Sequence, residues 1–209
     1  MKPHPLDKEI ERGIRVLAKK DKKLAVVIKR VGKRNYRSQR TAFDALARII
    51  IGQQLSGKAA ETIYQRVRAK TSNKRVTLKS ISAVSDQDLR SCGLSAAKTR
   101  AIRDLSDKID TGQLKISSFS HMTDDEVAEA IISVKGLGPW SAQMYLMFVL
   151  CRLDIFSAGD LGIQNAICKL YGKDKAKIDF DKFAKRWQPY RTIACWYLWA
   201  SLANPPVKG

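Results

Sequence analysis

The chain has 209 residues, and its 39 lysines and arginines against 20 aspartates and glutamates give a formal net charge of +19 at pH 7. Such an excess indicates a polyanionic partner, because each basic side chain that meets a phosphate releases a condensed counterion. A solvated basic surface is the plainer alternative. The N-terminal segment is charged throughout and the longest apolar run, residues 144–151, is short, so we expect neither a secretory leader nor a membrane span.

The four cysteines and two histidines bear on metal and redox chemistry. The cysteines lie far apart in the sequence and form no C-x-x-C pair, so we expect neither a zinc nor an iron–sulfur ligand set. Free thiols in a reducing compartment are the expected state. Two histidines also make a histidine-based catalytic triad or metal site unexpected.

Helix-start signals recur along the chain ahead of apolar stripes with helical spacing. In chain order they are Asp7, Asp21, Ser56, Ser85, Ser95, Thr123, Pro139 and Asp160. Gly32 and Gly93 are predicted to end the helices before them, and Thr123 with Glu126 fits the capping-box pattern. Residues 71–80 are predicted to form a basic surface loop. No run alternates with a period of two, so the predicted fold is all-α, with roughly ten helices joined by short connections.

The run VKGLGPW, residues 134–140, combines two glycines with a proline. Gly136 is predicted to end one helix, and Pro139 to begin the next after a two-residue linker. The glycines, including Gly138, permit positive φ and a close approach of the backbone. The new helix presents backbone N–H groups and the positive end of its dipole, which can bind a phosphate. A plain turn between two helices is the alternative.

Five segments together resemble a known family. The segment VKGLGPWSA at 134–142 resembles the helix-hairpin-helix of base-excision DNA glycosylases, and DIFSAGDLGIQNAI at 154–167 resembles the segment that carries their essential aspartate. Three further segments are similar to the alkylpurine branch, the AlkA/Mag-type 3-methyladenine (alkylbase) DNA glycosylases, and within it to yeast Mag-like proteins. They are IIIGQQLSGKAAETIYQRV at 49–67, CGLSAAKTRAIRDLS at 92–106 and WQPYRTIACWYLW at 187–199.

The resemblance implies two helical subdomains that flank a DNA-binding cleft. One subdomain would combine residues 1–37 with residues 152–209. The other, residues 38–151, would be a central bundle that ends in the helix-hairpin-helix at 134–150. Proteins of this family bend duplex DNA, fill the vacated stack with a wedge and flip the damaged nucleotide into a pocket.

Asp160 matches the catalytic aspartate of the family, with an ordinary helix cap as the alternative. Departure of an alkylated purine leaves positive charge on the sugar, which a nearby carboxylate can stabilise while it orients water. Trp140 stands where strand-cutting relatives carry a lysine, so no lyase activity is expected. Trp140 and Trp199 also match aromatic walls of the base pocket, and would attract a cationic base by about 1–2 kcal/mol. Core tryptophans are the alternative.

Further positions follow from the same resemblance. Met144 is a pocket position where relatives carry an aromatic residue, as is Ala200. Gln54 and Leu55 are the candidate DNA wedge, for which a plain helix–helix turn is the alternative. The predicted contacts with the DNA backbone are Ser56, Lys58, Lys98, Gly136, Gly138 and Ser141.

The expected activity is that of a monofunctional alkylbase DNA N-glycosylase, which excises alkylated purines and leaves an abasic site. Ser157, Gly159 and Gln164 depart from the family pattern around the aspartate, and they motivate an alternative, a homologue that binds abasic or damaged DNA with little or no catalysis. A general helical nucleic-acid-binding module is a third reading, but it leaves the five ordered segments unexplained.

The expected partner is damaged double-stranded DNA, and no association with a membrane is expected. The expected oligomeric state is a monomer. No cofactor is expected, although hairpin carbonyls could hold a monovalent cation. We expect a nuclear location if the chain is eukaryotic, and the cytoplasm or nucleoid otherwise.

Overall fold

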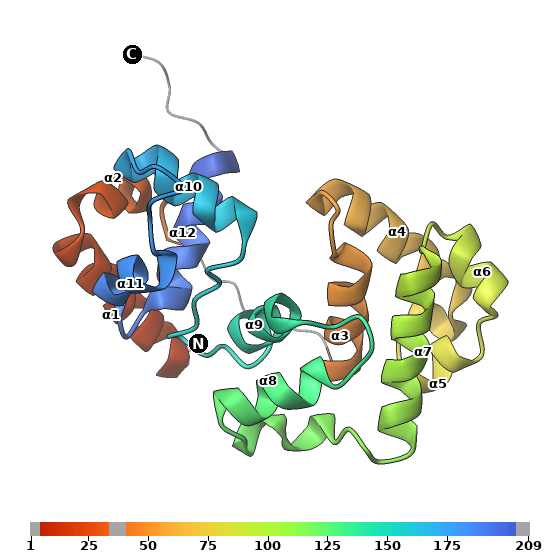
Figure 1. Ribbon diagram of the computed structural model, residues 1–209. Coiled ribbons are helices and arrows are strands. Elements are labelled where there is room, and N and C mark those ends of the chain that lie inside the picture. Colours follow the sequence, from red (N-terminus) through yellow and green to blue (C-terminus); the bar gives the residue numbers. More distant parts are fainter. Residues whose placement is uncertain (1–4, 34–40, 204–209) are drawn as a thin grey trace. The chain divides into compact units, whose positions relative to one another are not determined.

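A computed structural model describes residues 5–33 and 41–203 of the protein. Over these residues the chain forms α-helices and short 3-10 helices and no strand, which confirms the predicted all-α fold (Figure 1). None of the described helices is long and apolar enough to cross a membrane.

The chain divides into two compact units, Met1–Arg37 with Cys151–Gly209, and Ser38–Leu150. The boundary between residues 150 and 151 falls one residue before the division expected from the sequence. Leu150 still donates a backbone hydrogen bond to Tyr145 in the preceding helix, whereas Cys151 takes a positive φ of 55° and starts the connection. The division after residue 37 lies outside the described residues.

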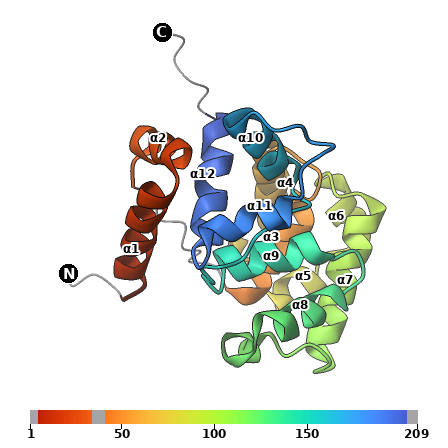
Figure 2. The same ribbon diagram turned by 60° about the vertical axis from the view of Figure 1, so that its left-hand side comes forward.

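The first unit, which combines the two ends of the chain, is built around the last helix. Its elements are α1 (Pro5–Lys20), α2 (Lys22–Val31), α10 (Leu161–Tyr171), α11 (Phe180–Ala184), η3 (Lys185–Trp187) and α12 (Arg191–Ala203). Helix α12 packs against α10, α2 and α1, and in Figure 2 it stands between α10 and the α1–α2 pair. Seven successive residues of α12, from position 192 to 198, are buried, so α12 supplies the core of this unit.

Asp21 ties the N-terminal helices to the C-terminal ones. As the N-cap of α2, its side chain accepts hydrogen bonds from the backbone N–H groups of Lys23 and Leu24. Its Oδ2 atom also accepts hydrogen bonds from the Tyr171 hydroxyl at 2.7 Å and from Trp187 Nε1 at 2.9 Å. Burial, together with the bond to Asp21, raises the pKa of Tyr171, so this hydroxyl keeps its proton. The buried carboxylate thus has four donors, as a buried charge requires.

The second unit surrounds α3. Its elements are α3 (Ala42–Gly52), α4 (Gly57–Lys70), η1 (Ser72–Lys74), α5 (Leu78–Ser82), α6 (Asp86–Ser91), α7 (Ala96–Asp110), η2 (Ile116–His121), α8 (Asp124–Ile132) and α9 (Pro139–Phe148). Helix α3 packs against α4, α7 and α9 (Figure 1). Leu46, Ala47 and Ile50 of α3 are completely buried, which explains the apolar stripe in this part of the sequence.

Most predicted helix caps are confirmed. The side chains of six of them accept hydrogen bonds from the first turn of the following helix: Asp21, Ser56, Ser85, Ser95, Thr123 and Asp160. Thr123 and Glu126 form the predicted capping box, and the hydrogen bonds from Thr123 lower the pKa of Glu126.

Two local predictions outside the hairpin are wrong. Asp7 does not cap α1, because this helix begins at Pro5 and places Asp7 inside its first turn. There the carboxylate still faces the positive end of the helix dipole. Residues 71–80 are not simply a loop, since they contain η1 and the first residues of α5. Thr77 and Ser80 form a capping box at the start of α5, and the serine at its third position hid the usual Glu or Gln signal.

Candidate functional site

Asp160 lies immediately before α10 and is held by two helices. Its Oδ1 atom accepts a 2.9 Å hydrogen bond from the backbone N–H of Ile163, the N-cap interaction of α10. The same atom accepts a second 2.9 Å hydrogen bond from the indole Nε1 of Trp199 on α12. The N-terminus of a helix favours negative charge at this place. The geometry therefore fixes the orientation of a carboxylate that is only half-buried.

Gly162 allows the indole to come this close. A Cβ atom at position 162 would lie 3.0 Å from Oδ1 of Asp160, and 3.1 and 3.2 Å from Cδ1 and Nε1 of Trp199. A larger residue would have to displace the carboxylate or the indole. Gly162 was not among the predicted site residues, although a glycine inside a helical pattern is a signal of close packing.

The segment before Asp160 is ordered by its own hydrogen bonds. The backbone N–H of Asp160 donates to the carbonyl of Ser157 at 3.1 Å. The side-chain Nε2 of Gln164 donates to the carbonyl of Ala158 at 2.7 Å. Ser157 is fully buried. The departures at Ser157 and Gln164 thus belong to a self-consistent turn that leads into α10.

The α3–α4 turn, residues 53–56, carries the predicted wedge. Gln54 has a φ of 57°, in the left-handed region that residues other than glycine seldom occupy. Its side chain is exposed, and Leu55 beside it is 39% exposed. Ser56 closes the turn by capping α4 through the backbone N–H of Ala59. Lys58, one residue into α4, is exposed. The turn therefore presents a polar and an apolar side chain to the outside.

Lys98, on α7, forms hydrogen bonds with the α3–α4 turn and with the end of α3. Its Nζ atom donates to the carbonyls of Ile51 and Gln53, both at 2.8 Å. These carbonyls lie at the C-terminal end of α3, where a cation also complements the helix dipole. Burial lowers the pKa of Lys98. The predicted contact between Lys98 and a DNA phosphate stays a prediction, while the structure gives this ammonium a role within the protein.

The hairpin differs from its predicted boundaries. Helix α8 ends at Ile132, four residues before Gly136, and the connection to α9 spans residues 133–138. The helical hydrogen-bond pattern ends before Gly136. Val134 donates at 3.1 Å to the carbonyl of Ile131, which is only three residues earlier. The left-handed turn at Gly136, with a φ of 80°, belongs to the connection and does not itself end α8. Pro139 is the first residue of α9, as predicted, and Gly138 is its N-cap.

Three hydrogen bonds and a close approach of the backbone at Gly136 hold the hairpin within its unit. A Cβ atom at Gly136 would lie 3.3 Å from the Cβ of Ala101 on α7. The backbone N–H of Lys135 donates to Oδ2 of Asp104, also on α7, at 2.8 Å. The side-chain Nε2 of Gln53 donates to the Gly136 carbonyl at 2.8 Å and to Ser141 Oγ at 3.2 Å. The predicted phosphate grip by Gly136, Gly138 and Ser141 stays a prediction, and Gln53 is a site residue that the sequence did not reveal.

The predicted pocket residues differ in burial. Trp140 and Trp199 are half-buried, whereas Met144 is only 6% exposed and Ala200 only 5%. Asp160 and Trp199 belong to the unit that joins the two chain ends, and Trp140 and Met144 to the other unit. Within the first of these units, the structure brings together the carboxylate and one of the two tryptophans.

Among the described residues, no three or more His, Cys, Asp or Glu side chains form a group that could hold a metal ion. A cation at the hairpin would instead be held by backbone carbonyls. The monovalent cation at the hairpin therefore stays a prediction.

The sequence model of a family described as HhH-GPD superfamily base excision DNA repair protein matches residues 47–189. This chain belongs to that superfamily. The matched region runs from α3 to the residues before α12, and it contains the α3–α4 turn, the hairpin and Asp160. The resemblance that the five sequence segments indicated is confirmed.

Individual proteins extend this result. A relative from Bacillus subtilis is 34% identical over 170 residues, which are 78% of this chain and 59% of that protein. An alkylbase DNA glycosidase-like protein of Schizosaccharomyces pombe is 28% identical over 200 residues, 92% of this chain and 94% of the relative. The solved structure of the 3-methyladenine DNA glycosylase of the same yeast, in complex with abasic DNA, is similar with a TM-score of 0.83 at 27% identity, covering 95% of this chain and 100% of that one.

Proposed function

We propose that the protein is a monofunctional DNA N-glycosylase of base excision repair. It would flip alkylated purines of the 3-methyladenine and 7-methylguanine type out of duplex DNA and release them, leaving an abasic site. The observation that carries this proposal is the carboxylate of Asp160, which Trp199 and Ile163 hold in one orientation at the start of α10. Membership of the superfamily supports base excision, and the similarity to a 3-methyladenine DNA glycosylase supports alkylated purines as the class of substrate.

The chemistry needs little beyond this carboxylate. Alkylation places positive charge on the purine, so the base departs as a neutral molecule when the bond from its nitrogen to the sugar C1′ breaks and the electron pair goes to the nitrogen. The positive charge is then on the sugar, where the carboxylate of Asp160 stabilises it. Water adds to C1′ and loses a proton, which completes the abasic sugar. No acid has to protonate the leaving base, in keeping with the two histidines of the sequence.

We further propose that the enzyme does not cut the strand. Strand cleavage by a lyase requires an amine that attacks the sugar carbon and forms a Schiff base. In this chain Trp140, in the first turn of α9, occupies the hairpin position where the resemblance places that amine. An indole cannot form a Schiff base. Its half-buried ring is suited instead to attract a cationic purine, and Trp199 is suited to the same task.

The proposed reaction consumes only water, so we propose that no cofactor takes part in it. Hairpin carbonyls could still hold a monovalent cation as part of a phosphate grip. We propose that the protein acts as a monomer on damaged double-stranded DNA. The net charge of +19 supports an anionic partner.

A second candidate function is the recognition of abasic or damaged DNA with little or no base release. Met144 and Ala200 favour it, because the family resemblance implies aromatic residues at both positions, and here these smaller side chains are almost completely buried. With fewer aromatic faces, a pocket attracts a cationic base less strongly. The similarity to an alkylbase DNA glycosidase-like protein of S. pombe is compatible with either function.

The deciding experiment compares base release with DNA binding in Asp160→Asn. Asparagine caps helices as well as aspartate does and keeps an oxygen that can accept the bonds from Ile163 and Trp199, so the fold should persist. We expect release of methylated purines from methylated duplex DNA to fall about 100-fold or more, with unchanged affinity for an abasic duplex.

The matched control is Asp179→Asn, which removes the same charge from the N-cap of α11 in the same unit. It should release base at the parent rate. If Asp160→Asn is as fast as the parent, Asp160 is not the catalytic group. If the parent binds abasic duplex tightly and releases no base even at excess protein, the second function is correct.

A further inference from the structure

The α3–α4 turn is held from two sides by polar contacts that the proposed chemistry does not use. The Lys98 ammonium donates to the carbonyls of Ile51 and Gln53, and the Gln53 side chain donates to Gly136 and Ser141 of the hairpin. The chain positions joined in this way are 45 to 88 residues apart in sequence. The turn is therefore fixed by tertiary contacts as well as by its own backbone.

Resting on the proposed function, we propose that Lys98 and Gln53 are positioning residues that hold Gln54 and Leu55 in the register needed to open duplex DNA. Neither residue has to touch the reacting atoms. Their task is to keep the α3–α4 turn at a constant distance from the hairpin, so that a phosphate bound at the hairpin sets where the two exposed side chains enter the base stack.

Lys98 supplies the first part of this arrangement. The last carbonyls of a helix have no partner inside the helix, and at the C-terminus of α3 one ammonium group satisfies two of them. A charged donor makes stronger hydrogen bonds than a neutral one. Because the two acceptors flank Gly52, they define the direction in which the chain leaves α3. The left-handed conformation of Gln54 follows directly after them, and such a conformation persists only where surrounding contacts enforce it.

Gln53 supplies the second part. Its backbone carbonyl accepts from Lys98 while its side-chain amide donates to the Gly136 carbonyl at 2.8 Å. One residue thus connects α7, the turn and the hairpin. The Gly136 carbonyl belongs to the left-handed turn of the hairpin, where φ is 80°. The contact therefore joins the two turns of this unit that carry residues predicted to bind DNA.

Helix α7 acts as the common support. On one side, Lys98 donates to the α3–α4 turn, and Asp104 accepts from the backbone N–H of Lys135. Ala101 on the same side leaves no room for a side chain at Gly136. Arg103 lies at about 140° around the helix from Lys98, from the 100° turn per residue of an α-helix.

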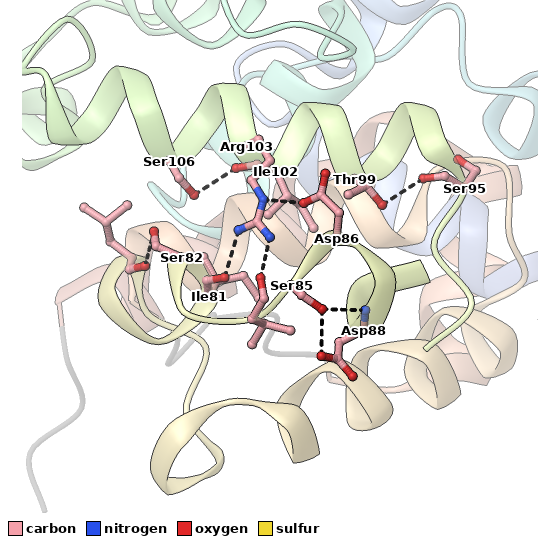
Figure 3. Close-up of polar contacts among 12 residues, drawn as sticks. Ile81, Ser82, Ser85, Asp86, Asp88, Ser95, Thr99, Ile102, Arg103 and Ser106 are labelled. Atoms are coloured by element: carbon pink, nitrogen blue, oxygen red, sulfur yellow. Dashed lines mark hydrogen bonds and ion pairs between the residues drawn. The ribbon is translucent and has the colours of Figure 1, made fainter. Parts of the chain in front are cut away.

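Arg103 fastens the other side of α7 (Figure 3). It donates to Asp86 at 2.7 Å, to the Ile81 carbonyl at 3.0 Å, and to the Val84 carbonyl. One side of α7 is thus bonded to the α5–α6 region, and its opposite side is bonded to both the α3–α4 turn and the hairpin.

The test compares two substrates that differ in how much opening they need. Both are duplexes with a single 7-methylguanine, paired with cytosine in one and placed in a one-nucleotide bulge in the other. For Lys98→Met and Gln53→Leu, we expect single-turnover base release from the paired duplex to fall about 10- to 100-fold, the scale of a misplacement near 1 Å. Release from the bulge, which is already unstacked, should stay within about threefold of the parent.

Lys108→Met is the matched control, because it removes the same charge from the far end of α7 and should behave as the parent with both duplexes. Lys98→Arg keeps donors for the two carbonyls and should recover most of the loss. Equal losses on paired and bulged substrates, or no loss on either, would overturn the positioning role. If Lys98→Met does not fold, as judged by its thermal unfolding, Gln53→Leu decides the question alone.

A separate readout covers the failure of the proposed glycosylase function. If the parent releases no base from either duplex, the fluorescence of 2-aminopurine beside an abasic site reports unstacking without any catalysis. The parent and Lys108→Met should raise this fluorescence on binding, and Lys98→Met and Gln53→Leu should bind with a smaller rise. An equal rise in all four proteins would reject the proposal even though no base is released.

Discussion

The indole N–H of Trp199 donates a 2.9 Å hydrogen bond to Oδ1 of Asp160, which lies 39 residues earlier in the chain. The sequence suggested these residues as separate parts of a site, one a carboxylate and the other a ring against the flipped base. In the structure they form a pair, with the backbone N–H of Ile163 as a further donor to the same oxygen. A change at Trp199 therefore acts on the carboxylate as well as on a bound base.

Trp199→Phe separates the two roles of this residue. Phenylalanine retains an aromatic face but has no N–H group, so Asp160 loses the hydrogen bond that Trp199 donates to Oδ1. Hydrogen bonds to charged groups contribute about 1.5–3 kcal/mol, so we expect single-turnover base release to fall about tenfold or more, with unchanged affinity for an abasic duplex. Release at the parent rate would mean that only the aromatic face of Trp199 matters.

Gly162→Ala tests the close packing beside the carboxylate. The new methyl group would start 3.0 Å from Oδ1 of Asp160 and 3.1 Å from the Trp199 ring. We expect it to push the two apart, lower the free energy of unfolding by about 1–3 kcal/mol, and reduce base release. Urea unfolding and a release assay measure these effects. Gly159→Ala is the control, because a Cβ there meets no atom within 4 Å, and an equal loss in both variants would argue against crowding as the cause.

Borohydride reduction tests the absence of lyase activity. A Schiff base between a protein amine and an abasic sugar is reduced by borohydride to a permanent link, which a denaturing gel detects. With Trp140 at the hairpin position, we expect no linked species after incubation with methylated or abasic duplex, and intact strands when alkali is omitted. A linked band that appears only with borohydride would contradict this and would point to a lysine elsewhere in the chain as the nucleophile.

Because of Glu126, we expect the free energy of unfolding to fall at acidic pH. The hydrogen bonds from Thr123 lower its pKa below the ordinary value of 4.5. A group whose pKa is lower in the folded state contributes stability above its unfolded pKa, and this contribution is lost as the pH falls through the folded pKa. Glutamine can form the same capping box without titrating. We therefore expect Glu126→Gln to show a smaller loss of unfolding free energy than the parent between pH 6 and pH 3, in urea titrations.

Glu129→Gln is the control for this prediction, since it removes the same charge from α8 outside the capping box. Its unfolding free energy should depend on pH as that of the parent does. If the two variants change the acid dependence equally, net charge is responsible and the capping box is not.

The sequence predicted those features that depend on neighbouring residues. The caps at Asp21, Ser56 and Asp160 each involve a side chain and a backbone N–H two or three positions away, so a short pattern suffices. The all-α class followed from many such patterns and from the apolar stripes between them. The end of α8 was misplaced because Gly136 looked like a helix stop, whereas the chain had already left the helix after Ile132.

The contacts that define the candidate site could not be predicted from short sequence patterns. Gln53 reaches Gly136 across 83 residues, and Lys98 reaches Ile51 across 47. No pattern within a single segment links such positions, and a lysine in a chain with a net charge of +19 is readily interpreted as a phosphate contact. Gly162 lies next to a recognised aspartate, but the neighbour that requires a glycine there is Trp199, which belongs to another helix.

The four hydrogen bonds to Asp21 have a consequence for the order in which the two units fold during synthesis. Asp21 meets Tyr171 and Trp187 across 150 and 166 residues, so α1 and α2 leave the ribosome long before the partners that bury them. The unit with the hairpin is one continuous stretch and is complete once Leu150 has emerged. During synthesis, therefore, the hairpin is assembled first, and the unit that holds Asp160 closes only when α12 arrives. A chain released before that point would contain the hairpin and lack the Trp199 partner of its carboxylate.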